Sequence, residues 1–461
     1  MRTTAWLLTA AMLVAACSDD GDNKTTPDGS VTWQDGASPT SDAAGADGAG
    51  SSSCKGDVCT LTGTLTESLT LTADKKWLLR GGVFIGDDVN QTVLTIEAGT
   101  TVYGETSTNG MLVIRRGSKI VAEGTKDKPI VFTSSKSPGS RARGDWGGII
   151  INGRATVNSC ADTTKTCEAY GEGGTGYYGG DKDDDDSGSL RYVRIEFAGR
   201  LISPDNELNG LALQGVGSKT RLEYIQVHMG KDDGIEFFGG AANFKYVMIT
   251  GSADDNLDWT DGWRGKGQFL VAVQYEDAGD NGIEADNNAE NNSAQPRSKP
   301  TLSNLTLVGQ AQSSFSDLGM LLREGTAANI SNVIVTNWNE SCLDIDHDET
   351  FTNAYAGGSL TGELTLASSI FNCATPFTEE SGDAFTVESF FKTLNTGNQI
   401  ADPKLTSATD VTKLDLRPAS GSPALQGASV PSDSFFDKVS FIGGVDPNND
   451  WTKGWTTSAP N

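Results

Sequence analysis

Apolar and polar residues alternate in short runs along most of the chain, and the runs end at turn-forming residues. Residues 92–100, 110–114 and 119–124 show this pattern, and residues 190–197 and 222–228 repeat it further along. An alternation of period two, bounded by glycine or asparagine, is typical of β-strands. Because helical periodicity is nowhere sustained, we predict an all-β protein.

Three stretches, residues 232–237, 254–259 and 280–285, share one order of side chains: an acid, an acid or amide, a turn former, an aliphatic residue and an acid. Their turn formers lie 22 and 26 residues apart. Self-similarity at such a period is the signature of a solenoid in which each repeat forms one coil. Because the fixed Leu and Asn ladder of leucine-rich repeats is absent, the sequence predicts a right-handed parallel β-helix.

The N-terminus has the pattern of an export signal. Residues 1–16 combine a short basic start with an apolar stretch too short to span a bilayer, and Cys17 follows two alanines. Residues 13–17 resemble the bacterial lipobox, so we assign 1–16 as a signal peptide and Cys17 as the site of lipidation. Residues 17–53 are rich in Asp, Gly, Ser, Thr and Ala, which predicts a disordered tether.

We therefore expect a lipid-anchored protein of the bacterial cell envelope, at the outer membrane or the cell surface, that meets the membrane through its N-terminal lipid. The formal net charge is −26. Such an acidic surface disfavours nucleic acid and anionic lipid, and it attracts cations. The partner classes that remain are a glycan and another surface protein.

Seven cysteines are present, and six remain once Cys17 is assigned to the lipid. An even number of cysteines in an exported chain indicates disulfides and argues against metal thiolates. We predict three local disulfides, which join Cys54 to Cys59, Cys160 to Cys167, and Cys342 to Cys373.

Several motifs of the chain are shared with known sequences. Residues 94–100, 144–148, 232–240 and 441–447 resemble a family of secreted bacterial parallel β-helix lipoproteins, and the resemblance covers residues 61–456. No biochemical activity is assigned to that family. The resemblance therefore implies the fold and the export route, and it implies no chemistry.

One repeating pattern without a linker-like break predicts a single β-helix domain at residues 54–430. Residues 431–461 contain two tryptophans and three prolines. An uncapped solenoid exposes apolar core and strand edges, so we predict that 431–461 form a cap over the open C-terminal end.

In each of the three similar stretches the aliphatic residue is expected to face the core. The acid that follows it then faces outward on the same side of every coil, which applies to Glu236, Asp258 and Glu284. Coils stack about 4.8 Å apart, and carboxylates at that spacing raise one another's pKa or recruit a cation. The pattern predicts an acidic ladder that needs a positive partner.

Ca²⁺ suits this ladder because hard oxygen ligands are abundant and softer ligands are scarce. Pairing with Arg264, Arg297 or Arg323 is a second interpretation, and it needs no ion. For the corner residues Asp233 and Asn281 an ordinary turn role is a further interpretation, since such residues bond neighbouring amides. The expected metal ligands are Asp233, Glu236, Asp255, Asp258, Asp280 and Glu284.

Catalysis is the third interpretation of the ladder. One acid of raised pKa would serve as general acid, and another as base or nucleophile, on a glycosidic bond. Trp263 beside the acids suits stacking on a sugar ring, and Arg264 or Arg323 suits binding or the role of a lyase base. Polysaccharide hydrolases and lyases often use this fold, which is an analogy at the level of the fold.

These observations predict a lipid-anchored β-helix that acts as a surface binding or structural protein and depends on Ca²⁺. The alternative is a polysaccharide-degrading glycoside hydrolase or lyase that uses Glu236, Asp258 and Glu284 as catalytic residues.

Overall fold

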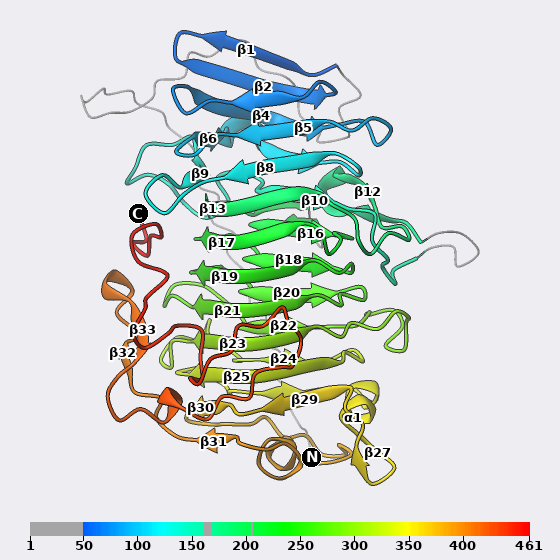
Figure 1. The fold of residues 1–461 in the computed structure, drawn as a ribbon, viewed down its shortest axis with the longest axis vertical. Coiled ribbons are helices and arrows are strands. Elements are labelled where there is room, and N and C mark those ends of the chain that lie inside the picture. The colour runs from blue at the N-terminus through cyan, green and yellow to red at the C-terminus, as the bar shows by residue number, and fades with distance from the viewer. Residues whose placement is uncertain (1–48, 161–166, 204–205) are drawn as a thin grey trace, which may run out of the picture. The chain divides into compact units, whose positions relative to one another are not determined.

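The computed structural model describes residues 49–160, 167–203 and 206–461. Within them the chain winds into a right-handed parallel β-helix (Figure 1), as the repeat pattern predicts. The predicted signal peptide, Cys17 and the tether up to residue 48 lie outside the described residues. In the part of the chain that is described, no helix is both long and apolar enough to cross a bilayer.

Each coil of the central β-helix contributes one short strand and one long strand. Parallel pairing joins every short strand to the short strands of the coils before and after it, so the short strands form one continuous stack. In stacking order they are β7 (Met111–Ile114), β10 (Ile149–Asn152), β16 (Leu211–Gln214), β18 (Ile235–Phe238), β20 (Leu257–Thr260), β22 (Ile283–Ala285), β24 (Leu321–Leu322) and β26 (Asp344–Ile345).

The long strands bend near their middle and form the other two faces of each coil. They are β13 (Gly188–Glu196), β17 (Arg221–His228), β19 (Asn243–Thr250), β21 (Lys266–Val273), β23 (Thr301–Val308) and β25 (Ala328–Thr336). In the outer coils the same faces are built from β2 (Val58–Leu65), β3 (Leu69–Leu71), β4 (Lys76–Ile85), β5 (Val93–Ile96), β6 (Thr101–Gly104), β8 (Lys119–Glu123), β9 (Ile130–Ser134), β29 (Leu364–Ala367), β30 (Ile370–Asn372) and β31 (Gln399–Ile400).

Short antiparallel pairs and helical turns decorate the coils. The hairpin strands are β1 (Ser51–Lys55) against β2, β11 (Ala169–Gly171) with β12 (Gly176–Tyr178), β14 (Arg200–Ser203) with β15 (Asn206–Leu208), β27 (Tyr355–Ala356) with β28 (Ser359–Leu360), and β32 (Leu405–Ser407) with β33 (Asp415–Pro418). The helical elements are η1 (Thr106–Thr108), η2 (Glu172–Gly174), α1 (Asp348–Ala354), α2 (Val387–Ser389), η3 (Phe390–Leu394), η4 (Val411–Lys413) and η5 (Pro423–Leu425).

The β-helix begins a few residues before the predicted start of the domain at residue 54. Strand β1 begins at Ser51, within the segment assigned to the tether, because its backbone pairs with the exposed edge of β2.

The three predicted disulfides are confirmed; they join Cys54 to Cys59, Cys160 to Cys167, and Cys342 to Cys373.

Residues at the bends of the long strands have positive φ angles and carry aromatic rings. The bends lie at Tyr192, Tyr224, Tyr246 and Phe269, with φ between 49° and 63°. Their rings stack from coil to coil, with centroids 4.4, 4.5 and 4.9 Å apart. Left-handed backbone is unfavourable for such residues, and the stacking offsets this cost. The result is an aromatic column along one edge of the β-helix.

The C-terminal segment covers this column, so the prediction that residues 431–461 cap the open end is wrong. The segment runs back along the side of the β-helix, where Gly443 donates its N–H to the Asn332 carbonyl (Figure 1, red). Trp451 and Trp455 are buried in the cluster that contains the bend rings. The aromatic rings exposed along the side of the β-helix gain from being shielded from water, as does the core at its open end.

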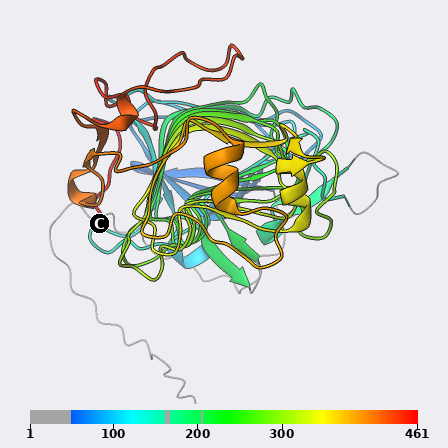
Figure 2. The same ribbon diagram turned by 90° about the horizontal axis from the view of Figure 1, so that it is seen from below.

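The open end is covered by other residues. Helix α2 and the adjoining turn η3 lie across the last coils (Figure 2). Val387, Phe390 and Phe391 from these two elements are fully buried in the main core, and the ring of Phe391 stacks on Phe371 of β30. This short helical segment therefore seals the hydrophobic core that the last strands would expose.

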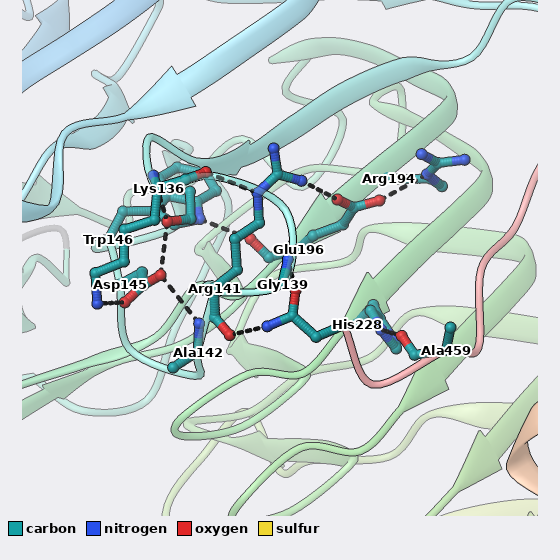
Figure 3. A network of polar contacts seen from close by, with 12 residues as sticks. Lys136, Gly139, Arg141, Ala142, Asp145, Trp146, Arg194, Glu196, His228 and Ala459 are labelled. Atoms are coloured by element: carbon teal, nitrogen blue, oxygen red, sulfur yellow. Dashed lines mark hydrogen bonds and ion pairs between the residues drawn. The ribbon is translucent and has the colours of Figure 1, made fainter. Parts of the chain in front are cut away.

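A polar network fixes the final residues of the chain to the β-helix (Figure 3). His228 is buried, and its ring joins the hydroxyl of Thr250 to the carbonyl of Ala459, at 2.8 and 2.9 Å. Burial lowers the pKa of His228 to about 4, and the positive charges of Arg194 and Arg143 act in the same direction. The imidazole is therefore neutral in the folded protein at neutral pH, with one nitrogen donating and the other accepting.

The depressed pKa of His228 predicts a loss of stability on acidification. An unfolded histidine takes up a proton near pH 6.5 and the folded one only near pH 4. The unfolded state therefore binds more protons between these values, and stability falls as pH drops through that window, by on the order of 3 kcal/mol in total. Above pH 6.5 the effect is absent. Urea unfolding from pH 7 to pH 4.5 measures it.

The matched variant is His228→Gln, whose amide offers one donor and one acceptor but no proton uptake. Other groups also titrate in this range, so the quantity of interest is the difference in unfolding midpoint between the wild type and the variant. That difference should favour the wild type at pH 7 and shrink as the pH is lowered. A difference independent of pH would contradict a buried, neutral His228.

Candidate cation site

Three outward acids form one row on the stack of short strands. The parallel registers pair Glu236 of β18 with Asp258 of β20, and Asp258 with Glu284 of β22. The aliphatic residue before each of them is buried in the core, because successive side chains of a strand point to opposite faces. The strand registers confirm the alignment of the predicted ladder, and its role stays a prediction.

The same row is apolar on the preceding coils and changes to acidic at Glu236. After Glu284 the register places Leu321 in the row, and Asp344 follows one coil later. The acids next to one another are therefore confined to three consecutive coils, and Asp344 is separated from them by a leucine. The apolar positions before Glu236 belong to one hydrophobic cluster with Tyr178 of β12, and they are Phe84, Val113, Ile150 and Ala212.

A second row of polar residues lies at the corners that precede the short strands. Asp233 accepts the backbone N–H of Asp255 at 3.1 Å, and Asp255 accepts that of Asn281 at 2.7 Å, each through Oδ1. Asn281 in turn accepts the backbone N–H of Leu318 through Oδ1 at 3.3 Å, so the side chains of Asp233 and Asn281 bond neighbouring amides as the corner interpretation predicts. Each of the two aspartates commits one oxygen to the turn and retains a second oxygen for another partner.

These rows line a cavity of about 300 Å³ in which every lining residue is Asp or Glu. Two of the carboxylates come from outside the three coils, namely Glu172 of η2 and Glu207 of β15. Both belong to hairpins that contact one another beside the short strands. The other lining residues are Asp232, Asp233, Glu236, Asp254, Asp255, Asp258, Asp280 and Glu284.

Burial and mutual repulsion disfavour the ionised form of these acids. Burial is the largest cause, and neighbouring carboxylates add to it, so the pKa values of Asp233, Glu236, Asp255 and Asp258 are raised well above their usual range. The pKa values of Asp232, Glu172, Asp280 and Glu284 are raised to about 7. So many carboxyls this close together cannot all ionise without a bound positive charge.

Two polar atoms beside the acidic rows have no hydrogen-bond partner among the described residues. Oδ1 of Asp258 is buried and unpaired. Asn209, at the corner of the coil before, donates its Nδ2 to Glu236, and its own Oδ1 is likewise buried and unpaired. A buried acceptor with no donor costs about 1–3 kcal/mol, and more when it is charged. Asp258 therefore has a buried oxygen available to bind a cation.

The donor set suits a hard divalent cation. Four overlapping groups of three carboxylates have ligand atoms within 4.8 Å of one another, so each group could hold a metal ion. Carboxylate oxygens are ligands of both Ca²⁺ and Mg²⁺. The groups are Asp232–Asp233–Asp254, Asp233–Glu236–Asp258, Asp254–Asp255–Asp280 and Asp255–Asp258–Glu284.

The predicted arginine partners divide into one that reaches the ladder and two that do not. Arg323 forms ion pairs with Glu284 and, at 3.0 Å, with Asp286. Arg264 pairs with Asp183 at 2.9 Å, and Arg297 donates to the carbonyls of Asn292 and Gly325. Arginine pairing therefore neutralises one end of the ladder only, and the prediction that Arg264 serves the acidic site is wrong.

Trp263 does not present its ring to a ligand, and the expectation that it is exposed is wrong. Its side chain is fully buried, and its ring stacks on Phe237 with centroids 4.0 Å apart. The chain turns at Asp261 and Gly262, both with positive φ, which directs Trp263 into the core. Large apolar rings in a solenoid gain more by filling the core than by facing water.

Sequence reasoning missed four acids that line the cavity: Asp232, Asp254, Glu172 and Glu207. The first two precede Asp233 and Asp255 and repeat at the same period, so the repeat itself carried the signal. Glu172 and Glu207 belong to insertions between strands, and the period of the coil gives no information on where an insertion folds.

The stacked coils and the lateral cavity define a right-handed parallel β-helix with an acidic site on the short-strand face. A family model described as a pectate-lyase like beta helix domain matches residues 63–456, and the chain belongs to this family.

Two solved structures match the chain over most of its length. The crystal structure of pectate lyase Pel9A has 12% sequence identity and a TM-score of 0.37, with 84% of this chain and 86% of that chain covered. The crystal structure of Dettilon tailspike protein (gp208) has 14% identity and a TM-score of 0.23, with 76% of this chain and 63% of that chain covered. A comparison with curated proteins found no match.

Proposed function

We propose that the protein is a lipid-anchored binding protein of the bacterial cell envelope that holds Ca²⁺ in its acidic cavity. The observation that carries the proposal is Asp258, a buried carboxylate with one unpaired oxygen at the centre of the acidic rows. Ca²⁺ is the cation that best matches a site of many carboxylate oxygens and no soft ligand.

Bound Ca²⁺ gives this protein a means of contact with partners that its charge would otherwise repel. The chain has a formal net charge of −26, so an anionic glycan or surface protein approaches only where cations neutralise the surface. A cation held at the rim of the cavity, with water completing its coordination, supplies such a place. Membership of a pectate-lyase like family supports a polysaccharide as the partner class.

The proposal predicts direct Ca²⁺ binding by the chain, with a Kd of about 0.1–1 mM, the range typical of extracellular sites. Isothermal titration of the chelator-treated protein at pH 7 measures it. Asp258→Asn is expected to weaken binding at least tenfold. Asp410→Asn, an exposed acid with its own local hydrogen bonds, is the matched control. Equal binding by the wild type and Asp258→Asn would refute the proposed site.

Glycoside hydrolysis is the second candidate, and the pKa of Glu236 favours it. Burial raises that pKa well above its usual range, as a general acid requires, and neighbouring Asp258 supplies a second carboxyl. A lyase base finds less support, because the cavity is lined by acids alone among the described residues. A screen for reducing sugars and unsaturated products on neutral and uronate polysaccharides tests this candidate. Turnover that Glu236→Gln abolishes would support it.

A further inference from the structure

We infer that the cavity binds a pair of divalent cations and that Asp258 bridges them. This inference rests on the proposed function, since it requires that the cavity holds Ca²⁺ at all. It adds the number of ions, the residues of each site and the coupling between them.

The sharing of Asp258 follows from the arrangement of the coils. Asp258 is the one residue common to the groups Asp233–Glu236–Asp258 and Asp255–Asp258–Glu284. The first group spans the coils of β18 and β20, and the second spans those of β20 and β22. Two sites related by one coil step are about 4.8 Å apart, close to the 3.5–4 Å separation of two-metal sites that share a carboxylate.

Each site takes one acid from the corner row and two from the ladder row. Asp233 and Asp255 already use Oδ1 for a backbone N–H, so each offers its other oxygen. Asp258 has an unpaired, buried Oδ1, and one oxygen for each of two ions satisfies the whole carboxylate. A single ion in either group would leave the other group of carboxylates without a bound metal ion.

Charge balance also favours two ions. The five carboxylates of these two groups carry five negative charges when ionised. Arg323 divides its single positive charge between Glu284 of this set and Asp286 outside it. Two divalent cations supply four positive charges and leave at most one negative charge unbalanced. One cation would leave at least two, which is unfavourable in a medium of low dielectric constant.

The bridge predicts a specific pattern of stoichiometry. Each one-site variant, Asp233→Asn or Glu284→Gln, should lose one equivalent of Ca²⁺ relative to the wild type, whereas Asp258→Asn should lose two. Equilibrium dialysis of the full chain with Ca²⁺, followed by metal analysis, gives these numbers. Asp344→Asn is the control, because Asp344 belongs to the same row but is separated by Leu321, and it should lose none.

The outcomes separate the two levels of inference. Loss of a single equivalent in Asp258→Asn would overturn the bridge while leaving Ca²⁺ binding intact. Absence of bound Ca²⁺ in the wild type would overturn the proposed function itself. Circular dichroism of each variant without Ca²⁺ shows whether the β-helix is retained. If Asp258→Asn is unfolded, Asp258→Ser serves in its place, and the two one-site variants combined should also lose two equivalents.

Discussion

Chelation of Ca²⁺ is expected to lower the melting temperature of the wild-type protein by about 5–10 °C at pH 7. A ligand that binds only the folded state, at a concentration a hundred times its Kd, adds about 2.7 kcal/mol, and two such sites add roughly twice that. Chelation also removes the counter-charge of Asp233, Glu236, Asp255 and Asp258, whose pKa values burial and mutual repulsion raise, so these acids must take up protons or repel one another. Differential scanning calorimetry with Ca²⁺ and with chelator measures the shift.

The Asp258→Asn variant is the control, because the difference in melting temperature between it and the wild type is expected to change sign when Ca²⁺ is removed. With Ca²⁺ present, the variant should melt below the wild type, because it has lost the bridging ligand. With chelator present, it should melt at or above the wild type, because the amide removes an acid that must otherwise stay protonated or repel its neighbours. A variant that is less stable under both conditions would indicate a packing role for Asp258 and contradict a cation ligand.

The repeat made the fold and the ladder predictable. Glu236, Asp258 and Glu284 follow an inward aliphatic residue at nearly constant spacing, so a solenoid must stack them on one face. The corner acids repeat at the same period, and Asp233 and Asp255 were therefore assigned to the correct site. Local sequence separation was likewise enough to predict the three disulfides, since each joins cysteines on the same or adjacent coils.

Three features lay beyond the repeat because they depend on how distant segments meet. The hairpins that bring Glu172 and Glu207 to the cavity arise from insertions. The C-terminal segment lies along the flank because the bend rings, such as Tyr224 and Tyr246, form an aromatic column there, and no single coil reveals a column. Trp263 turned inward because positive φ angles at one corner reverse the alternation that an extended strand would follow.

The acidic site also depends on what lies on either side of it in the same row. The positions before Glu236 are apolar and are covered by the hairpin β11–β12, and the position after Glu284 is Leu321. The covered apolar positions before Glu236 restrict water at that end of the acidic segment, which strengthens the interaction between the carboxylates and a cation. A ladder of the same acids on an open face would be solvated and would hold a cation weakly.

Substitution of Trp263 by alanine is expected to destabilise the β-helix by about 3–5 kcal/mol. The ring is fully buried, stacks on Phe237 at 4.0 Å and lies 5.7 Å from the ring of Trp259. Its Nε1 donates a hydrogen bond to the carbonyl of Ala242 at 3.1 Å, and that carbonyl would lose its partner. The void left by the missing ring would lie inside the coils of β18 and β20, next to Phe237 and Trp259. These coils should therefore unfold at a lower urea concentration than in the wild type.

Phe315→Ala is the matched control, since Phe315 is 52% exposed and its loss should cost less than about 0.5 kcal/mol. Urea unfolding followed by circular dichroism compares the two variants with the wild type. A β-helix can unfold in parts, so the comparison uses the midpoint of the transition. If Trp263 instead presented its ring to a sugar, Trp263→Ala would unfold with the wild type and lose only glycan binding. A shifted midpoint, with Ca²⁺ binding retained at low urea, is the result that a core role requires.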